Sequence, residues 1–136
     1  MDVFWESLVN DLWSLHLAIM GILVSVLTLL YASLCGKVEE LDSIKQSEEF
    51  ILMNRATAVR NYINQLRSLN KQVMLGLIIS FCLFVLTTII KYLPEECVVI
   101  KWITSFNSIA TIGLLVFGIK IAREVYSQYQ KETKKI

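Results

Sequence analysis

Three long apolar runs limit what this chain can fold into. They lie at about residues 14–35, 73–93 and 98–120, and charged residues occur only near their ends. Each run reaches or approaches the roughly 20 residues with which an α-helix crosses a hydrocarbon core of about 30 Å. Inside a bilayer every backbone polar group must find its partner within the protein, so the runs are predicted to be transmembrane helices.

The composition agrees with a membrane protein. Hydrophobic residues make up 55% of the 136 residues, and there are only 5 Gly and 1 Pro. A soluble domain of this size is rarely so apolar. The length suits one domain, 1–136, and a net charge of +1 offers no basic surface for a nucleic acid duplex. We therefore expect an all-α protein with a single transmembrane domain.

The first run is expected to stay in the mature protein as a true span. The segment before it carries Asp2, Glu6 and Asp11 and no Lys or Arg, whereas a signal peptide begins with a basic leader. Residues 1–13 have two readings that remain open. They form either a short amphipathic helix in the membrane interface or an upstream extension of the first span.

The distribution of Lys and Arg predicts the orientation. Segments 1–13 and 92–97 contain none, whereas segment 36–72 contains six and segment 121–136 contains four. Positively charged segments stay in the cytoplasm. The N-terminus is therefore expected outside, and the long connection and the C-terminal tail in the cytoplasm, in a multi-pass protein of a cell membrane that we take to be a bacterial inner membrane.

The connection 36–72 is predicted to be a cytoplasmic helical hairpin. Its apolar residues Leu52, Ala56, Val59 and Ile63 alternate spacings of four and three, which is typical of a helix with one buried stripe. The expected turn lies at 46–49, and the second helix of the hairpin runs into the second span. The third helix is expected to continue past Lys120 into the tail 121–136.

A stripe of small and polar side chains follows the third span. At 100° per residue, its members lie within roughly 40° of one line, and Leu114 is expected on the opposite side. Two readings of this stripe are open: a close helix–helix seam, or the lining of a water-filled pore. The stripe consists of Thr104, Ser108, Thr111, Gly118 and Ala122, flanked by Asn107 and Lys101.

A pore would require a cyclic homo-oligomer, because three packed helices enclose no channel. Four to six copies are expected. The predicted outer mouth consists of Glu95, Glu96 and Lys101, with a mild preference for cations. The predicted lining residues are Thr104, Asn107, Ser108, Thr111 and Gly118.

The other two spans carry weaker signals. The second span has a fainter stripe that favours helix packing, formed by Gly76, Ser80, Thr87 and Lys91. The first span has scattered hydroxyls such as Ser25 and Thr28, which favours an outer, lipid-facing position. The single histidine, His16, is either a packed residue or a proton sensor.

One face of the predicted cytoplasmic helix is basic. It suits contact with anionic lipids of the inner leaflet or, in a sharper reading, binding of an anionic small-molecule messenger. The residues of this face are Arg60, Asn64, Arg67 and Lys71.

The sequence offers no support for catalysis or for a cofactor. Its cysteines, Cys35, Cys82 and Cys97, do not have metal-ligand spacing, so no metal site is expected. Catalytic motifs such as a nucleophile elbow or a His–Glu zinc motif are missing from the sequence. The chain is therefore not expected to be an enzyme.

In layout alone, the chain is similar to three-span holins, with an outside N-terminus, three helices and a charged cytoplasmic tail. It also looks like the small membrane effectors of bacterial antiphage systems. The polar stripe of the third span and the structured cytoplasmic layer favour a homo-oligomeric ion channel gated from the cytoplasm. The resemblance to the antiphage proteins implies a role as a membrane-permeabilising effector in antiviral or stress defence. The alternatives are a non-conducting structural or accessory subunit of a larger membrane complex, or a holin-like lysis pore.

Overall fold

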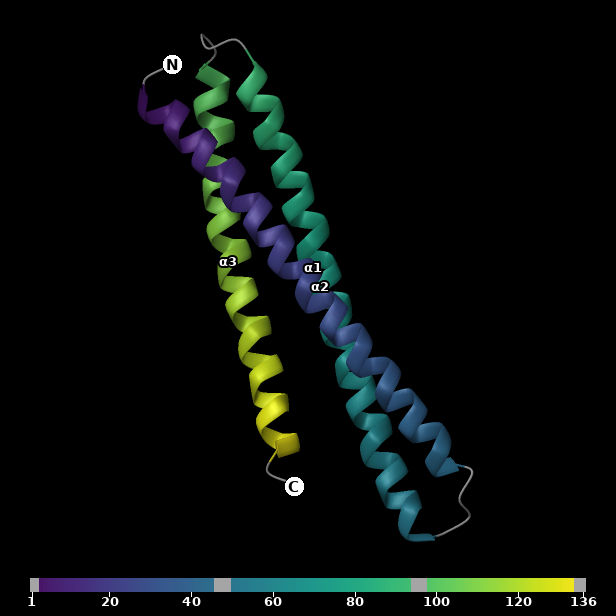
Figure 1. Ribbon diagram of the computed structural model, residues 1–136. Coiled ribbons are helices and arrows are strands. Elements are labelled where there is room, and N and C mark those ends of the chain that lie inside the picture. The colour runs from purple at the N-terminus through teal and green to yellow at the C-terminus, as the bar shows by residue number, and fades with distance from the viewer. Residues whose placement is uncertain (1–2, 46–49, 94–97, 134–136) are drawn as a thin grey trace.

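The computed structural model describes residues 3–45, 50–93 and 98–133, and these form three helices. They are α1 (Val3–Lys45), α2 (Phe50–Tyr92) and α3 (Val98–Thr133) (Figure 1). No strand occurs in these ranges. The all-α fold expected from the sequence is therefore confirmed.

Each helix contains a window that is long and apolar enough to cross a membrane. The mean hydropathy of these windows is 2.3 in α1, 2.7 in α2 and 1.6 in α3. Helices satisfy their backbone hydrogen bonds internally, which hydrocarbon requires. The chain is accordingly a multi-pass membrane protein with three spans.

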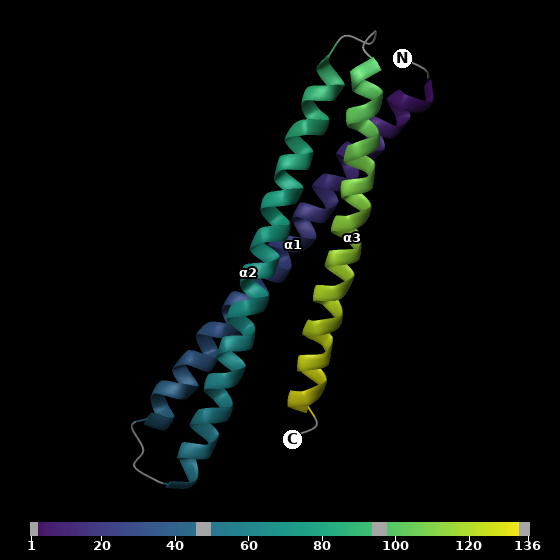
Figure 2. The same cartoon turned by 180° about the vertical axis from the view of Figure 1, so that it is seen from behind.

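The helices run alternately up and down. The N-terminal ends of α1 and α3 and the C-terminal end of α2 lie at one end of the molecule, here called the junction end (Figures 1 and 2). The C-terminal end of α1 and the N-terminal end of α2 lie at the other, here called the hairpin end. Helix α3 is shorter, with 36 residues against 43 in each of the others, so α1 and α2 continue beyond its C-terminus as a pair.

Buried side chains recur every three or four residues on all three helices. On α2 the series runs through Val59, Ile63, Leu66, Val73 and Ile90. A repeat of 3.5 residues keeps one face of each helix against its neighbours. It is typical of knobs-into-holes packing between helices that wind around each other with a left-handed twist. The fold is therefore an elongated bundle with one continuous seam.

The seam is held together differently along its length. Within the spans, lipid tails are as apolar as leucine, so close van der Waals packing stabilises the helix contacts. At Gly76 an added Cβ would lie 3.4 Å from the Phe117 ring and 3.7 Å from Leu23, which marks a close approach of all three helices. At the hairpin end, Leu41 and Ile63 belong to a cluster outside the apolar runs, where removal from water is worth about 1.5–3 kcal/mol per side chain.

The helix bounds decide between the two readings of the N-terminal segment, and they agree with the predicted continuation of the first and third helices beyond the spans. Helix α1 is unbroken from Val3, so residues 3–13 are an upstream extension of the first span. Helix α1 also continues past Gly36 to Lys45, and α3 continues past Lys120 to Thr133. The predicted turn at 46–49 lies outside the described residues.

An ion-pair cluster ties α1 to α2 near the hairpin end. The Glu40 carboxylate accepts hydrogen bonds from Lys37 Nζ at 3.0 Å and from Arg55 on α2 at 2.9 Å. Glu40 lies beyond the apolar run 14–35. The hydrogen bond from Lys37, followed by that from Arg55, holds the pKa of Glu40 below its ordinary value. The ionised carboxylate thus contributes stability above its unfolded-state pKa, and this contribution is lost as the pH falls through the folded-state pKa.

We predict that Glu40→Gln lowers the free energy of unfolding at neutral pH by about 0.5 kcal/mol, because both partly exposed ion pairs are removed. The difference between wild type and variant should shrink as the pH falls through the folded-state pKa of Glu40, which lies below its ordinary value. Thermal unfolding in detergent, followed by circular dichroism, measures this. Glu39→Gln on the exposed side of α1 is the matched control. A difference between wild type and Glu40→Gln that stays constant with pH would contradict the prediction.

Candidate functional site

Polar side chains are concentrated in the seam toward the junction end. We call this set the polar layer. All of its side chains are at most 2% exposed, although they lie in stretches predicted to cross the membrane. Buried polar groups in such stretches are costly unless they are paired, and they are a default place to look for function. The polar layer consists of His16 on α1, Ser80 and Thr87 on α2, and Thr104, Asn107 and Thr111 on α3.

Hydrogen bonds of the polar layer connect all three helices. The Asn107 amide nitrogen donates to Thr87 Oγ1 at 2.6 Å, and Thr87 donates its own proton to the Leu83 carbonyl at 2.8 Å. The Thr111 hydroxyl donates to the Asn107 carbonyl at 2.7 Å and lies 3.3 Å from His16 Nε2. A hydroxyl has one proton, so His16 Nε2–H must be the donor to Thr111.

Three atoms of the polar layer have no hydrogen-bond partner in the described part of the chain: His16 Nδ1, Asn107 Oδ1 and Ser80 Oγ. Because His16 donates through Nε2–H, its Nδ1 is an acceptor, and the Asn107 Oδ1 is an acceptor as well. The polar layer can therefore accept further hydrogen bonds, but it is enclosed by helices on all sides. Of the two sequence readings, His16 is a packed residue in this arrangement.

The structure separates the residues that were predicted to line a pore. Thr104, Asn107 and Thr111 lie inside the protomer, in the positions of a helix–helix seam. Ser108 is half-buried and donates to the Thr104 carbonyl at 2.9 Å. Gly118 is half-buried and lines an apolar groove of about 580 Å³ between α1 and α3. This arrangement supports the seam reading for the buried three.

One expectation about α3 was wrong. Leu114 was assigned to the side opposite the stripe, but it is buried in the seam. The reason is the position of the seam. At 100° per residue Leu114 lies only about 20° from Asn107, so it shares the side of α3 on which Asn107 is buried. The true seam is centred on Asn107, which the sequence placed only at the edge of the stripe.

The other predicted site residues lie at the N-terminal end of α3 and along the half of α2 nearer the hairpin end. Lys101 is exposed, with its Nζ 6.0 Å from the centre of the Trp5 ring. Glu95 and Glu96 lie outside the described residues. The basic face of α2 is exposed at every position, and these are Arg60, Asn64, Arg67 and Lys71.

A second candidate surface, which the sequence reasoning missed, lies on α1. Seven small residues follow one another at spacings of four and three along the side of α1 that faces away from the seam, and all are exposed. We call this surface the α1 back face. It consists of Ser14, Ala18, Gly21, Ser25, Thr28, Ala32 and Cys35. Its signal is present in the sequence, but only the hydroxyl residues were considered there, and Ala18 and Gly21 are not polar.

Large apolar side chains flank the α1 back face on both sides. On one side they are Leu17, Val24 and Tyr31, and on the other Ile22 and Leu29, all exposed. The α1 back face is thus a shallow furrow between two ridges. Such furrows allow another helix backbone to approach closely.

The outward faces of the other helices are different. That of α2 carries large aliphatic residues such as Leu75, Ile78 and Ile89, and that of α3 carries Phe106 and Ile109, all exposed. Bulky apolar surfaces of this kind suit lipid. The α1 back face is therefore the surface that stands apart.

Comparison with known protein families, with curated proteins and with solved structures finds no match. In residues 3–45, 50–93 and 98–133, no three potential metal ligands of the His, Cys, Asp or Glu type lie together. The site must therefore be interpreted from its own geometry.

We predict that Thr87→Val lowers the free energy of unfolding by about 1 kcal/mol more than Thr88→Val does. Both threonines donate to the carbonyl four residues earlier, but only Thr87 also accepts the bond from Asn107. Interhelical hydrogen bonds in membranes are worth roughly 0.6–1.7 kcal/mol. Unfolding of the two purified variants by titration with a denaturing detergent measures the difference. Equal losses would show that the bond from Asn107 does not stabilise the bundle.

Proposed function

We propose that this chain is the subunit of a homo-oligomeric membrane channel in which the α1 back face points toward the central axis. The observation that carries the proposal is the small, partly hydroxylated, uncharged surface of α1 between Ser14 and Cys35. In the sequence reading this role belonged to α3. We move it to α1 because Thr104, Asn107 and Thr111 have their partners inside the protomer.

A single protomer does not supply a path for ions. Its seam is filled by buried side chains from Val9 to Ile44 on α1. A conducting path therefore needs several protomers around an axis, and we propose four to six. In such a ring, the bulky outward faces of α2 and α3 are available for lipid and for neighbouring subunits.

The hydroxyls of the α1 back face suit a weakly cation-preferring lining. Ser25 Oγ donates to the Gly21 carbonyl and Thr28 Oγ1 donates to the Val24 carbonyl, both at 2.9 Å. With its proton bound to the helix, each oxygen presents lone pairs outward, which suits water or a cation. Because charge is missing from this surface, the preference should be mild.

We further propose that the hairpin end lies in the cytoplasm and gates the channel. The bias of Lys and Arg supports the orientation. The unbroken α1 supports the gating, because one rigid helix links the axis to the ion pairs at Glu40 near the hairpin end. A trigger that displaces the hairpin would thereby tilt or rotate the lining helix, for example an anionic messenger on the basic face of α2. This suits a membrane-permeabilising effector of a bacterial antiphage or stress system.

We predict that Ser25→Leu strongly reduces single-channel conductance in planar bilayers, because a ring of leucines would narrow and dry the path. Val24→Leu is the matched control, since it adds bulk to the neighbouring residue on the flanking ridge and should leave conductance nearly unchanged. Thr111→Ala should also leave it nearly unchanged.

The pattern across these variants separates the possible errors. Conductance that responds to Thr111→Ala but not to Ser25→Leu would return the axis to α3. Purified protein that never conducts, with an intact fold by circular dichroism, would contradict the channel itself.

The second candidate is a non-conducting accessory subunit. The furrow of the α1 back face favours it specifically, because a helix of a different membrane protein could pack there as closely as a second copy. The oligomeric state in detergent distinguishes the two functions. A closed ring of identical chains supports the channel, whereas a monomer that co-purifies in fixed ratio with another membrane protein supports the accessory subunit.

A further inference from the structure

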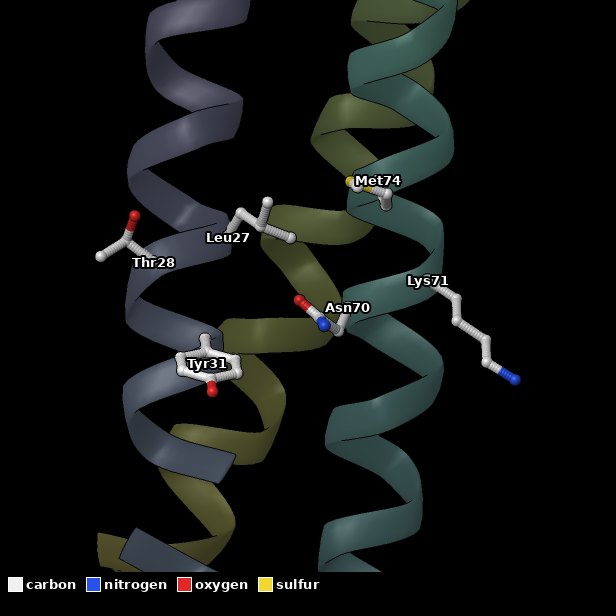
Figure 3. Close-up of a pocket in the computed structure, with 6 residues that line it drawn as sticks. All are labelled: Leu27, Thr28, Tyr31, Asn70, Lys71 and Met74. Atoms are coloured by element: carbon white, nitrogen blue, oxygen red, sulfur yellow. The ribbon is translucent and has the colours of Figure 1, made fainter. Parts of the chain in front are cut away.

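A pocket of about 490 Å³ opens between α1 and α2 where the apolar runs end toward the hairpin. It is lined by Leu27, Thr28 and Tyr31 of α1 and by Asn70, Lys71 and Met74 of α2 (Figure 3). Leu27 points from α1 toward α2, and the Asn70 amide points from α2 toward α1. The pocket is thus formed by the two helices that are proposed to connect axis and hairpin.

The polarity of the pocket changes along the membrane normal. Leu27 and Met74 lie on the side of the membrane centre, within the apolar runs. Tyr31, Asn70 and Lys71 lie toward the hairpin end, close to where the runs 14–35 and 73–93 meet polar sequence. A phospholipid in the leaflet on that side has the same order, with acyl chains toward the centre and phosphate toward the surface.

The polar end of the pocket has groups that can hold a phosphate. The Asn70 carboxamide can donate to a phosphate through its Nδ2 group. Its Oδ1, which is buried and without a partner in the described chain, can accept a hydrogen bond from a headgroup hydroxyl. Lys71 is exposed and forms no ion pair within the described residues. Arg67, one turn closer to the hairpin, is exposed as well. Lys71 and Tyr31 both line the pocket, so an ammonium group and a phenol hydroxyl are available as donors to one anionic headgroup.

Lys71 has the freedom that this role requires. In Figure 3 its side chain leaves α2 on the side away from α1. A lysine ammonium on a flexible four-carbon stem can turn toward a phosphate at the pocket mouth without movement of the helix. Near a charged membrane surface, each Lys or Arg adds attraction for anionic lipid.

We propose that the α1–α2 pocket binds one anionic phospholipid, with its phosphate at Lys71, Asn70 and Tyr31 and the start of an acyl chain against Leu27 and Met74. The proposal requires the spans but not the channel, so it can fail or hold independently of conductance. Its ligand class is a phosphate-bearing amphiphile of the leaflet on the hairpin side.

Native mass spectrometry of the purified full-length chain tests this proposal. The probes are phosphatidylglycerol, phosphatidylcholine with identical acyl chains, and inorganic phosphate. We expect one phosphatidylglycerol per chain at concentrations where phosphatidylcholine and inorganic phosphate do not bind. Lys71→Gln should weaken phosphatidylglycerol binding about five-fold, and Lys71→Arg should retain it.

Lys120→Gln is the matched control, because Lys120 is an exposed lysine at the same edge of the membrane on α3, away from the pocket. Met74→Trp is a second variant that keeps the charge but fills the pocket with a bulky ring at an exposed position, and it should also weaken binding. Circular dichroism checks that each variant is folded.

The following results would overturn the proposal. Equal weakening by Lys71→Gln and Lys120→Gln would mean general surface attraction rather than a site. Equal binding of phosphatidylcholine would remove the role of the cations. Binding of inorganic phosphate as strongly as phosphatidylglycerol would show an anion site without a lipid.

Discussion

In hydrocarbon, a polar group without a partner is costly, and this constraint organises the bundle. Within the described residues, six polar side chains are fully or nearly fully buried, and they lie together in the polar layer. Asn107 connects α3 to α2 through Thr87, and Thr111 connects α3 to α1 through His16. Apolar contacts between membrane helices tolerate sliding and rotation, whereas paired polar groups fix the register. The polar layer therefore determines which side of each helix faces outward.

The direction of the three outward faces then sets the chemistry of the surface. Because His16 points into the seam, the residues at its back, including Ser14 and Ala18, must point out. The α1 back face is thus a consequence of the same pairing that buries Asn107. A rotation of α1 would turn the α1 back face away from any partner or axis. Loss of a single hydroxyl, as in Thr111→Ala, leaves the Asn107–Thr87 hydrogen bond and the apolar side chains of the seam to hold the helices in place.

The spans and the helical continuation of α1 and α2 beyond them were predictable because their causes are local. Length, lack of charge and the spacing from Ala56 to Ile63 are visible in short windows of sequence. The polar layer was only partly predictable. Thr104 and Thr111 belong to a visible stripe, but the pairing of His16 with Thr111 joins residues 95 positions apart and depends on how three helices pack. No window of the sequence contains that information.

The α1 back face was missed for a physical reason too. A small residue such as Gly21 has the same hydropathy whether it packs in a seam or faces out, and an added Cβ at Gly21 would meet nothing within 4 Å. Only the burial of Ile19 and Leu23 in the seam shows that Gly21, which lies between them, faces away from the seam. Once the seam is known, the same alternation of three and four residues is visible on both sides of α1: in the buried side chains of the seam and in the small residues of the α1 back face.

Thr28 connects the two proposals. It belongs to the α1 back face and also lines the lipid pocket between α1 and α2. A phospholipid in that pocket would lie beside the surface that neighbouring copies of α1 approach, close to Leu27 and Tyr31. The two proposals together place the lipid and the neighbouring subunit at the same turn of α1. The bound lipid would then favour the spacing between subunits that leaves room for its phosphate. By linkage, a ring that changes its spacing on opening must then change its affinity for anionic lipid by the same free energy.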